Sequence, residues 1–163
     1  MRGRGGFTLI EVLIVIVILA ILISGGYSSY RKVQMRSLAR RAAAEVAAAF
    51  RDARGLCQRR NVKTRVKLKN TGEYSVYVKS GGTYKEVYTR KFLEGTEFHY
   101  KKSSASPWLP LPHILFVSYR PPFAEIGIKA TLFRARVESF PEAEACFRVF
   151  GVTGRVVMAD ECP

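Results

Sequence analysis

Glu11 is the one carboxylate inside the apolar run GFTLIEVLIVIVILAILISGG, which spans residues 6–26. A charged side chain within a membrane-spanning helix is costly, about 2.5–3.5 kcal/mol at the helix centre on insertion scales. A cation that forms an ion pair with the carboxylate offsets much of that cost. The sequence therefore predicts that Glu11 meets a positively charged partner, and the chemistry that it indicates is ion pairing rather than catalysis.

Few other residues have the chemistry of a catalytic or metal site. His99 and His113 are the only two histidines, and no carboxylate stands at a spacing that would complete a metal site with them. The sequence contains neither a G-x-S-x-G motif nor a phosphate-binding P-loop. We therefore expect no enzymatic activity, no cofactor and no bound metal.

The three cysteines, Cys57, Cys146 and Cys162, leave at least one thiol unpaired within a monomer. Cys146 and Cys162 flank the last predicted hairpin, where a disulfide would fix the C-terminus, although spacing alone leaves the pairing open. Cys57 lies in a predicted helix before a basic run that could lower its pKa. A free cysteine on the packed side of a helix is more often a small buried apolar residue.

Positive charge is concentrated in one part of the chain. Residues 31–69 hold thirteen of the 27 Lys and Arg residues against two carboxylates, and the whole chain has a net charge of +14. Such a local excess suggests an anionic partner, which could be nucleic acid, an anionic membrane surface or an acidic protein. Within it, VKTRVKLK (62–69) alternates apolar and basic residues with the period of a strand. One face of that strand would carry the basic row, which we define as Lys63, Arg65, Lys67 and Lys69.

A long helix is expected to precede this strand. Residues 7–30 are predicted to form a transmembrane helix, since the apolar run is close to the length needed to span a bilayer. Residues 31–61 are predicted to continue it as an amphipathic helix, because apolar residues recur there at steps of three and four. The helix should end near Arg59 and Arg60, where cations suit the negative end of the helix dipole and Asn61 can cap it.

Residues 62–163 are predicted to form a β-rich head domain. Asn70-Thr71-Gly72 and the SGGT segment at 80–83 are turn signals between strands, and residues 103–113 are typical of an irregular connection. Strands are expected at 62–69, 73–79, 84–92, 96–101, 114–119, 126–137, 144–150 and 154–159. The expected fold is α+β, with a long N-terminal helix packed on an antiparallel β-sheet.

Two rules give different accounts of the N-terminal segment. A basic start followed by an apolar run is typical of a secretory signal peptide, but no A-x-A-like cleavage site follows Ile23. The charge-bias rule would place the C-terminal side in the cytoplasm, because cations after the run outnumber Arg2 and Arg4 before it. Neither rule explains Glu11.

The residues G-F-T-L-I-E (6–11), followed by an apolar helix, resemble the signal of type IV prepilins and type II secretion pseudopilins. The resemblance implies that a prepilin peptidase removes residues 1–6 by cleaving after Gly6, and that Phe7 becomes the N-methylated N-terminus. It implies that Glu11 pairs with the N-terminal amine of a neighbouring subunit. It also implies a single pass through the bacterial inner membrane with the N-terminus in the cytoplasm, followed by incorporation into a periplasmic or cell-surface filament with other pilin or pseudopilin subunits.

Later segments are similar to the GspH/FimT type of minor pseudopilin. They are AFRDARGLCQRRNVKTRVKL (49–68), EGTEF (94–98) and FRVFGVTGRVVM (147–158). FimT-type members tend to end in a glycine-arginine motif with a second arginine. Here Gly154-Arg155 is followed by two valines, so the resemblance carries over only Arg155 as a candidate DNA contact.

Two functions follow from these features. In the first, the protein is a DNA-binding minor pilin that acts in DNA uptake or surface adhesion. Arg59, Arg60, the basic row and Arg155 then bind DNA phosphates in a salt-dependent way. Tyrosines among these cations would add base stacking, although tyrosines in strands are more often packing residues; these are Tyr77, Tyr84 and Tyr88. In the second, the protein is a purely structural tip pseudopilin for protein secretion, whose basic face contacts acidic subunits. The lysines of the basic row would alternatively protect an exposed sheet edge from aggregation.

Overall fold

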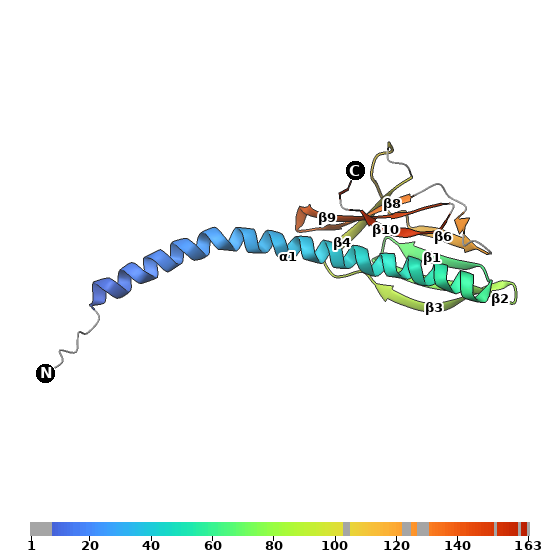
Figure 1. The fold of residues 1–163 in the computed structure, drawn as a ribbon, viewed down its shortest axis with the longest axis horizontal. Helices are drawn as coiled ribbons and strands as arrows, with labels where there is room; N and C mark the ends of the chain where they lie inside the picture. The colour runs from blue at the N-terminus through green and yellow to red at the C-terminus, as the bar shows by residue number, and fades with distance from the viewer. Residues whose placement is uncertain are drawn as a thin grey trace. The chain divides into compact units, whose positions relative to one another are not determined.

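The structure, a computed structural model, describes residues 8–102, 105–121, 125–126, 131–151, 153–159 and 161–162. The chain divides between Gln34 and Met35 into two compact units. Apart from Thr8, the described part of the first unit belongs to α1 (Leu9–Arg60), which continues into the second unit. The second unit, here called the head, also contains all the strands found among the described residues (Figure 1).

Local sequence signals set both ends of α1. At its start, the backbone N–H of Glu11 donates to Oγ1 of Thr8 at 3.4 Å, so that Thr8 acts as an N-cap. At its end, Arg59 and Arg60 occupy the last turn, and Asn61 follows with a φ of 48°. A left-handed residue stops the helix, and Asn tolerates that conformation better than most side chains. The predicted end of the helix is therefore confirmed.

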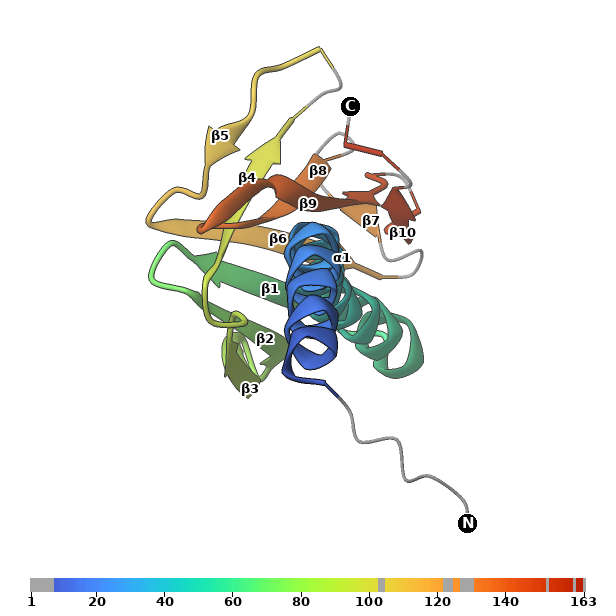
Figure 2. The ribbon, with the colours of Figure 1, turned by 90° about the vertical axis from the view of Figure 1, so that its left-hand side faces the viewer.

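The head contains two five-stranded sheets in which every pairing of strands is antiparallel. In order across the first sheet lie β3 (Thr83–Lys91), β2 (Glu73–Ser80), β1 (Thr64–Lys69), β6 (Ile114–Arg120) and β7 (Glu125–Ile126). In order across the second lie β10 (Val156–Ala159), β9 (Phe140–Val149), β8 (Thr131–Val137), β4 (Thr96–Lys101) and β5 (Leu109–Pro110). In Figure 2, β9 of the second sheet lies above β6 and β1 of the first.

The β2–β3 hairpin follows directly from its sequence. Ser80 pairs with Thr83, so the connection is the two residues Gly81 and Gly82. Their φ values are 57° and 87°, which is the positive-φ pair that a type I′ turn requires. Because this turn matches the right-handed twist of the strands, it fixes the register in which β3 lies beside β2.

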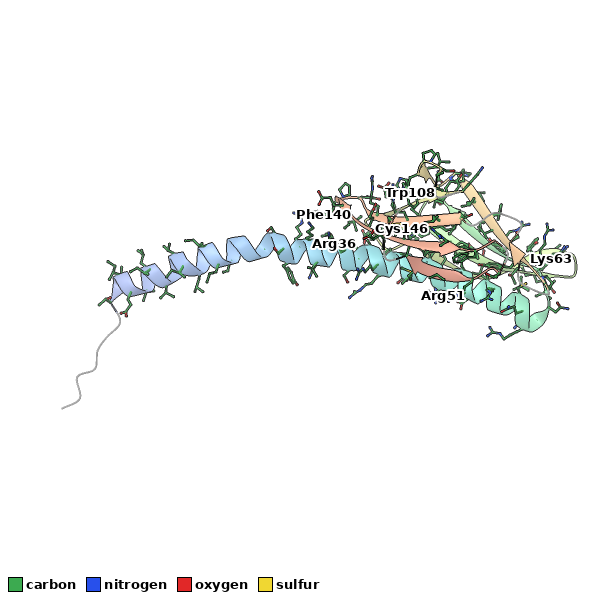
Figure 3. All side chains as sticks on the ribbon, turned by 45° about the horizontal axis from the view of Figure 1, so that its top comes forward. Arg36, Arg51, Lys63, Trp108, Phe140 and Cys146 are labelled. Atoms are coloured by element: carbon green, nitrogen blue, oxygen red, sulfur yellow. A yellow bond between two sulfur atoms is a disulfide. The ribbon has the colours of Figure 1, made fainter. Side chains whose placement is uncertain are left out.

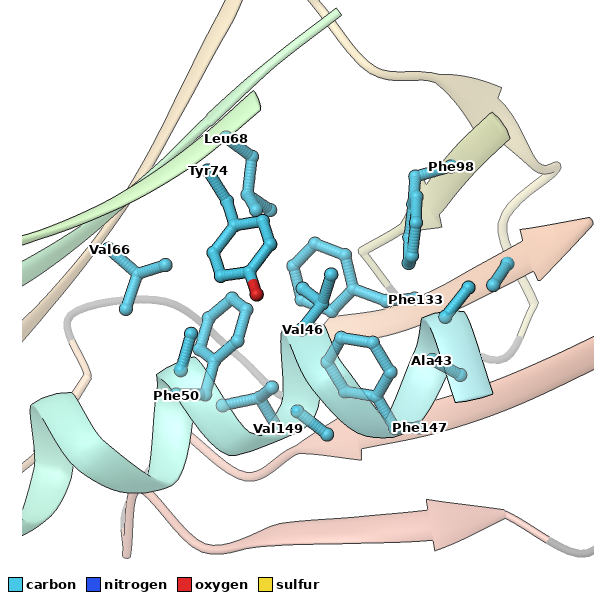
Figure 4. Close-up of a cluster of buried hydrophobic side chains, with 14 of the residues drawn as sticks. Ala43, Val46, Phe50, Val66, Leu68, Tyr74, Phe98, Phe133, Phe147 and Val149 are labelled. Atoms are coloured by element: carbon cyan, nitrogen blue, oxygen red, sulfur yellow. The ribbon is translucent and has the colours of Figure 1, made fainter. Parts of the chain in front are cut away.

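One core lies between the helix and both sheets. Phe50 of α1 contacts Phe133 of β8 and Phe147 of β9, with ring centroids 5.2 and 5.7 Å away (Figure 4). From the first sheet, Val66 and Tyr74 point toward the same helix (Figure 4). The helix approaches the sheets closely because its buried face is built from small residues, which are Ala39, Ala42, Ala43, Ala47, Ala49 and Ala53.

The predicted α+β fold, with a long N-terminal helix packed on antiparallel β-structure, is confirmed, but several strand limits were wrong. The expected strand 126–137 is two strands in different sheets, β7 and β8, and residues 127–130 lie outside the described residues. β5 lies within the stretch expected to be irregular. β9 begins at Phe140 rather than near 144, so Pro141 is in a strand. A proline is tolerated at this position because β10 pairs only with Cys146–Val149 of β9. On the side of β9 that faces β10, Pro141 therefore has no described partner strand, and its missing N–H breaks no hydrogen bond there.

Candidate functional site

The part of α1 in the first unit has an apolar surface that no other part of the described chain covers. Its large apolar side chains from Leu9 to Ile23 are between 48% and 83% exposed, and they occur on all sides of the helix. The helix is long and apolar enough to cross a membrane, and none of its most apolar stretch is buried. A helix that is apolar all round is normally covered by lipid or by other apolar helices. This surface therefore indicates membrane anchoring.

Glu11 lies in the first turn of that helix, with an exposed side chain. Its backbone N–H donates both to Oγ1 of Thr8, at 3.4 Å, and to the carbonyl oxygen of Thr8, at 3.1 Å. The positive end of the helix dipole favours a carboxylate at this position. The T-x-x-E spacing of a capping box could have predicted this local role. Gly6 and Phe7 lie outside the described residues, so cleavage and the ion pair of Glu11 stay predictions.

Apart from Lys63, the basic row belongs to β1, at the centre of the first sheet. Thr64, Val66 and Leu68 are fully buried toward the helix, so the alternating Arg65, Lys67 and Lys69 face outward. β2 and β6 pair with β1 on its two sides. Because β1 is not an edge strand, the alternative that these lysines protect an exposed edge is wrong. Lys63, just before β1, is exposed and lies at the opposite end of the head from Phe140 (Figure 3).

Arg65 is held in place by three neighbours on the outer face. Its guanidinium carbon lies 4.0 Å from the ring centroid of Tyr84 and 4.8 Å from that of Phe116. Its Nε donates to Oγ of Ser118 at 3.1 Å. Among the described residues, neither of its Nη atoms has a hydrogen-bond partner. Arg65 is therefore a fixed cation with two free donor groups.

Lys69 is the member of the basic row whose charge is compensated. Its Nζ lies 2.8 Å from Oε2 of Glu73, the residue paired with it on β2. The hydrogen bond from Lys69 lowers the pKa of Glu73, and the same bond raises the pKa of Lys69. Within the described part of the chain, Lys63, Arg65 and Lys67 form no ion pair.

The structure brings together only some of the predicted DNA contacts. Arg59 and Arg60 are exposed in the last turn of α1. Three residues of chain reach at most about 11 Å, so Arg60 stays close to Lys63 at the start of the basic row. Arg155 is exposed in the turn between β9 and β10 of the second sheet, and it does not extend the basic row.

The contacts of Tyr77, Tyr84 and Tyr88 favour the packing role over the alternative of base stacking. The hydroxyl of Tyr88 donates to Asp52 of α1 at 3.0 Å, so Tyr88 lies on the inner side of β3. The hydroxyl of Tyr77 donates to Glu86 at 3.0 Å, and the ring of Tyr84 packs against Arg65. These contacts agree with the usual packing role of strand tyrosines.

Phe116 is an exposed aromatic residue that the sequence did not single out. It lies on β6 directly beside Lys67, and it is 42% exposed. Ile114, two residues earlier on the same face, is 38% exposed. The outer face of the first sheet therefore combines cations with an accessible aromatic ring. Alternation in ILFVSYR (114–120) could have suggested an outward Phe116, but not its place beside the basic row.

Two cations on the outer face of the second sheet are already paired. Arg134 forms an ion pair with Glu144 at 3.1 Å, and Arg136 forms one with Glu97 at 2.8 Å. Trp108 covers part of this face, with its ring 4.4 Å from the guanidinium carbon of Arg134. These charges stabilise the head and are less available to an outside anion.

The cysteines show one disulfide and one buried thiol. Cys146 and Cys162 are joined, with their Cα atoms 5.4 Å apart, whereas Cys57 is free and fully buried. Burial raises the pKa of Cys57, so the alternative that the basic run activates this thiol is wrong. The disulfide lines a groove of about 930 Å³ whose charges are of both signs. The described residues contain no cluster of three metal-ligating side chains, and we assign the groove no ligand.

Comparisons with known proteins agree with these features. A family model described as the prokaryotic N-terminal methylation motif matches residues 1–27. Two crystal structures of the type IV minor pilin FimU from Pseudomonas aeruginosa (strain PAO1), in space groups P21 and P65, resemble this structure with TM-scores of 0.58 and 0.55. Each is 14% identical in sequence, and the matches cover 78% and 76% of this chain and 94% and 96% of the FimU chains. A sequence comparison with curated proteins gave no match. The resemblance to type IV pilins and pseudopilins is thereby confirmed.

Proposed function

We propose that this pilin-like chain is a minor subunit of a type IV pilus or a type II secretion filament, and that its basic row binds DNA electrostatically. The observation that carries the first part is the combination of a prepilin methylation motif with an unburied apolar helix. Such a helix needs apolar surroundings, which the inner membrane offers before assembly and neighbouring subunits offer afterwards.

In this proposal Glu11 sets the position of each subunit. A prepilin peptidase cleaves after Gly6, and Phe7 becomes the methylated N-terminus. The carboxylate of Glu11 then neutralises the N-terminal amine of the neighbouring subunit in an apolar environment, where an unpaired charge is costly. An added subunit with an incorrect register would leave both charges unpaired.

Processing and assembly test this part separately. Coexpressed with a prepilin peptidase, Gly6→Ala is expected to keep the precursor mass, whereas Glu11→Ala is expected to reach the mature mass. Glu11→Gln, which keeps the size but not the charge, should be recovered in sheared filaments much less than the wild type. Cleavage of Gly6→Ala, or normal filament recovery of Glu11→Gln, would contradict the proposal.

DNA binding is supported by the charges that remain unpaired on the first sheet. Lys63, Arg65 and Lys67 have no ion-pair partner among the described residues, and Arg59 and Arg60 lie at the adjoining helix end. Each cation that contacts a phosphate releases a counterion, so affinity should fall steeply with salt. The resulting binding is independent of sequence, because phosphates carry no base information.

A salt titration of the full chain in a nonionic detergent tests DNA binding. The logarithm of the association constant is expected to fall linearly with the logarithm of salt concentration, with a slope of about −0.9 for each phosphate contact on duplex DNA. Absence of DNA binding at physiological salt, together with binding to acidic pilin subunits, would contradict this part. It would favour the purely structural alternative.

A further inference from the structure

We infer that the outer face of the first sheet recognises single-stranded nucleic acid, with Arg65 holding a phosphate and Phe116 stacking against a base. This inference rests on the proposed DNA binding by the basic row and specifies its ligand. It goes beyond a row of cations, because it requires a fixed guanidinium and an accessible ring on the same face. The structure has both, on adjacent strands.

The first element is the preorganisation of Arg65. The rings of Tyr84 and Phe116, from strands on opposite sides of β1, lie 4.0 and 4.8 Å from the guanidinium carbon, and Ser118 accepts the hydrogen bond of its Nε. A flexible arginine loses side-chain freedom when it binds a ligand, whereas a fixed one has lost it already. The two Nη groups form a planar fork that suits the two oxygens of a phosphate.

The second element is the exposed ring of Phe116. It is 42% exposed, although Arg65 lies near it and Nζ of Lys67 is 5.8 Å from its centroid. A base that stacks on this ring would lie beside two cations of β1. They are Lys67, which pairs with Phe116 itself, and Arg65, which pairs with Ser118. Single-strand binding proteins combine these two components, cations along the backbone and rings under the bases.

Single strands are favoured because stacking needs an unpaired base. In a duplex, the flat faces of the bases are covered by their neighbours, and a ring on a sheet surface meets only phosphates, sugars and base edges. In a single strand each base has a face available for a ring. Phe116 therefore adds affinity for single strands alone, whereas the basic row attracts both forms.

An oligonucleotide without bases separates the two contributions. We would measure binding of the full chain, in nonionic detergent at fixed salt, to a labelled thymidine 20-mer, to an abasic strand of equal length and to a duplex. The expected order places the thymidine strand tightest. Phe116→Leu should weaken binding of the thymidine strand roughly tenfold, within the range known for loss of one base–aromatic stack. It should weaken binding of the abasic strand much less, because that strand loses only the contact of Phe116 with Arg65.

Two variants complete the test. Phe116→Tyr keeps a ring and should retain the preference for the thymidine strand. Phe150→Leu is the matched control. Phe150 is a 36% exposed phenylalanine just after β9 of the second sheet, and its ring centroid lies 5.8 Å from the guanidinium carbon of Arg148. Phe150→Leu should change neither the affinity for the thymidine strand nor that for the abasic strand. Thermal unfolding of each variant would show that the head is folded.

Each outcome distinguishes this inference from the proposed function. Equal binding of thymidine, abasic and duplex ligands, with no effect of Phe116→Leu, would overturn the inference and leave DNA binding by the basic row intact. Loss of the thymidine preference in Phe150→Leu as well would also overturn it, since the effect would not belong to this face. No binding to any of the three ligands would overturn both, and acidic subunits would then be the partners of the basic row.

Discussion

The two sheets of the head show opposite uses of positive charge on their outer faces. On the second sheet, Arg134 and Arg136 each lie within 3.1 Å of a glutamate on an adjacent strand. On the first sheet, only Lys69 has such a partner. Paired charges across strands stabilise the sheet that carries them. Unpaired charges add little to that stability, and they leave their attraction available to a ligand.

This difference teaches that the net charge of the chain is a poor guide to its binding surface. Both faces are rich in cations, and a sequence count treats them alike. Only the register decides which cations meet carboxylates. Lys69 pairs with Glu73 across β1 and β2, whereas Lys67 lies between Ser75 and Phe116. In the proposed function, the first sheet is therefore the binding surface, whereas the ion pairs of the second sheet contribute to stability.

The largest expected effect comes from reversing the basic row. The variant Lys63/Arg65/Lys67/Lys69→Glu should lower DNA affinity at physiological salt by about a hundredfold or more, because several phosphate contacts become repulsive. The control is Arg36/Arg40/Arg41/Arg51→Glu on α1, which changes the net charge by the same amount. An equal loss of affinity in the control would show that net charge, rather than the first sheet, attracts DNA.

The second prediction concerns the second sheet. Arg134→Gln/Arg136→Gln should lower the free energy of unfolding by about 1–2 kcal/mol, since it removes two part-exposed ion pairs and the contact of Arg134 with Trp108. Lys63→Gln/Lys67→Gln removes equal charge from the first sheet and should change that free energy by less than about 0.5 kcal/mol. DNA affinity should show the opposite pattern, falling mainly in Lys63→Gln/Lys67→Gln and little in Arg134→Gln/Arg136→Gln. Denaturant unfolding and DNA titration of the same samples would reveal whether the two faces differ as described.

A third, smaller effect should appear when Lys69 is released. Glu73→Gln removes its ion-pair partner, so DNA affinity is expected to rise a few-fold and the salt slope to steepen by up to about 0.9. Glu97→Gln releases Arg136 on the second sheet and changes the net charge equally, yet it should leave DNA binding unchanged. Equal strengthening of DNA binding by Glu73→Gln and Glu97→Gln would contradict the proposed difference between the outer faces of the two sheets.

The smallest effect is a difference in pH sensitivity. Burial lowers the pKa of His99 on the second sheet below its ordinary value of 6.5, so the unfolded chain binds a proton more readily than the folded one. Stability associated with His99 should therefore fall as pH drops below about 6.5, and His99→Gln should remove that loss. On the first sheet, the folded state lowers the pKa of Glu73, so the stability that this carboxylate contributes should be lost only as the pH falls below about 4.5. Urea unfolding between about pH 2.5 and pH 8 would separate the two windows, and a loss near pH 6 that persists in His99→Gln would exclude His99 as its source.

Much of the fold follows from local sequence, because the signals that specify it are local. The strict alternation at 62–69 predicted which side chains of β1 face outward, and Asn61 indicated the end of α1. The G-F-T-L-I-E segment predicted the pilin-like fold. Each of these depends on residues only a few positions apart.

What the sequence did not predict depends on pairing between distant segments. β1 pairs with β6 some fifty residues later, and this pairing places Phe116 beside Lys67 and Ser118 beside Arg65. No local period shows which strands become neighbours, so neither the separation into two sheets nor the central position of β1 was predicted. The inward direction of Tyr88 was missed for a similar reason, since it follows from the register shift beside Val76 in the β2–β3 pairing.

The disulfide between Cys146 and Cys162 has a consequence for how this protein withstands proteolysis. β10 has four residues and pairs with β9 alone, so by itself it would be easily lost. The disulfide closes a covalent ring that includes the exposed turn of Thr153 and Arg155. A protease that cuts this turn therefore yields a nicked molecule of unchanged mass apart from one added water, with β10 still attached. Its two pieces would separate only after reduction.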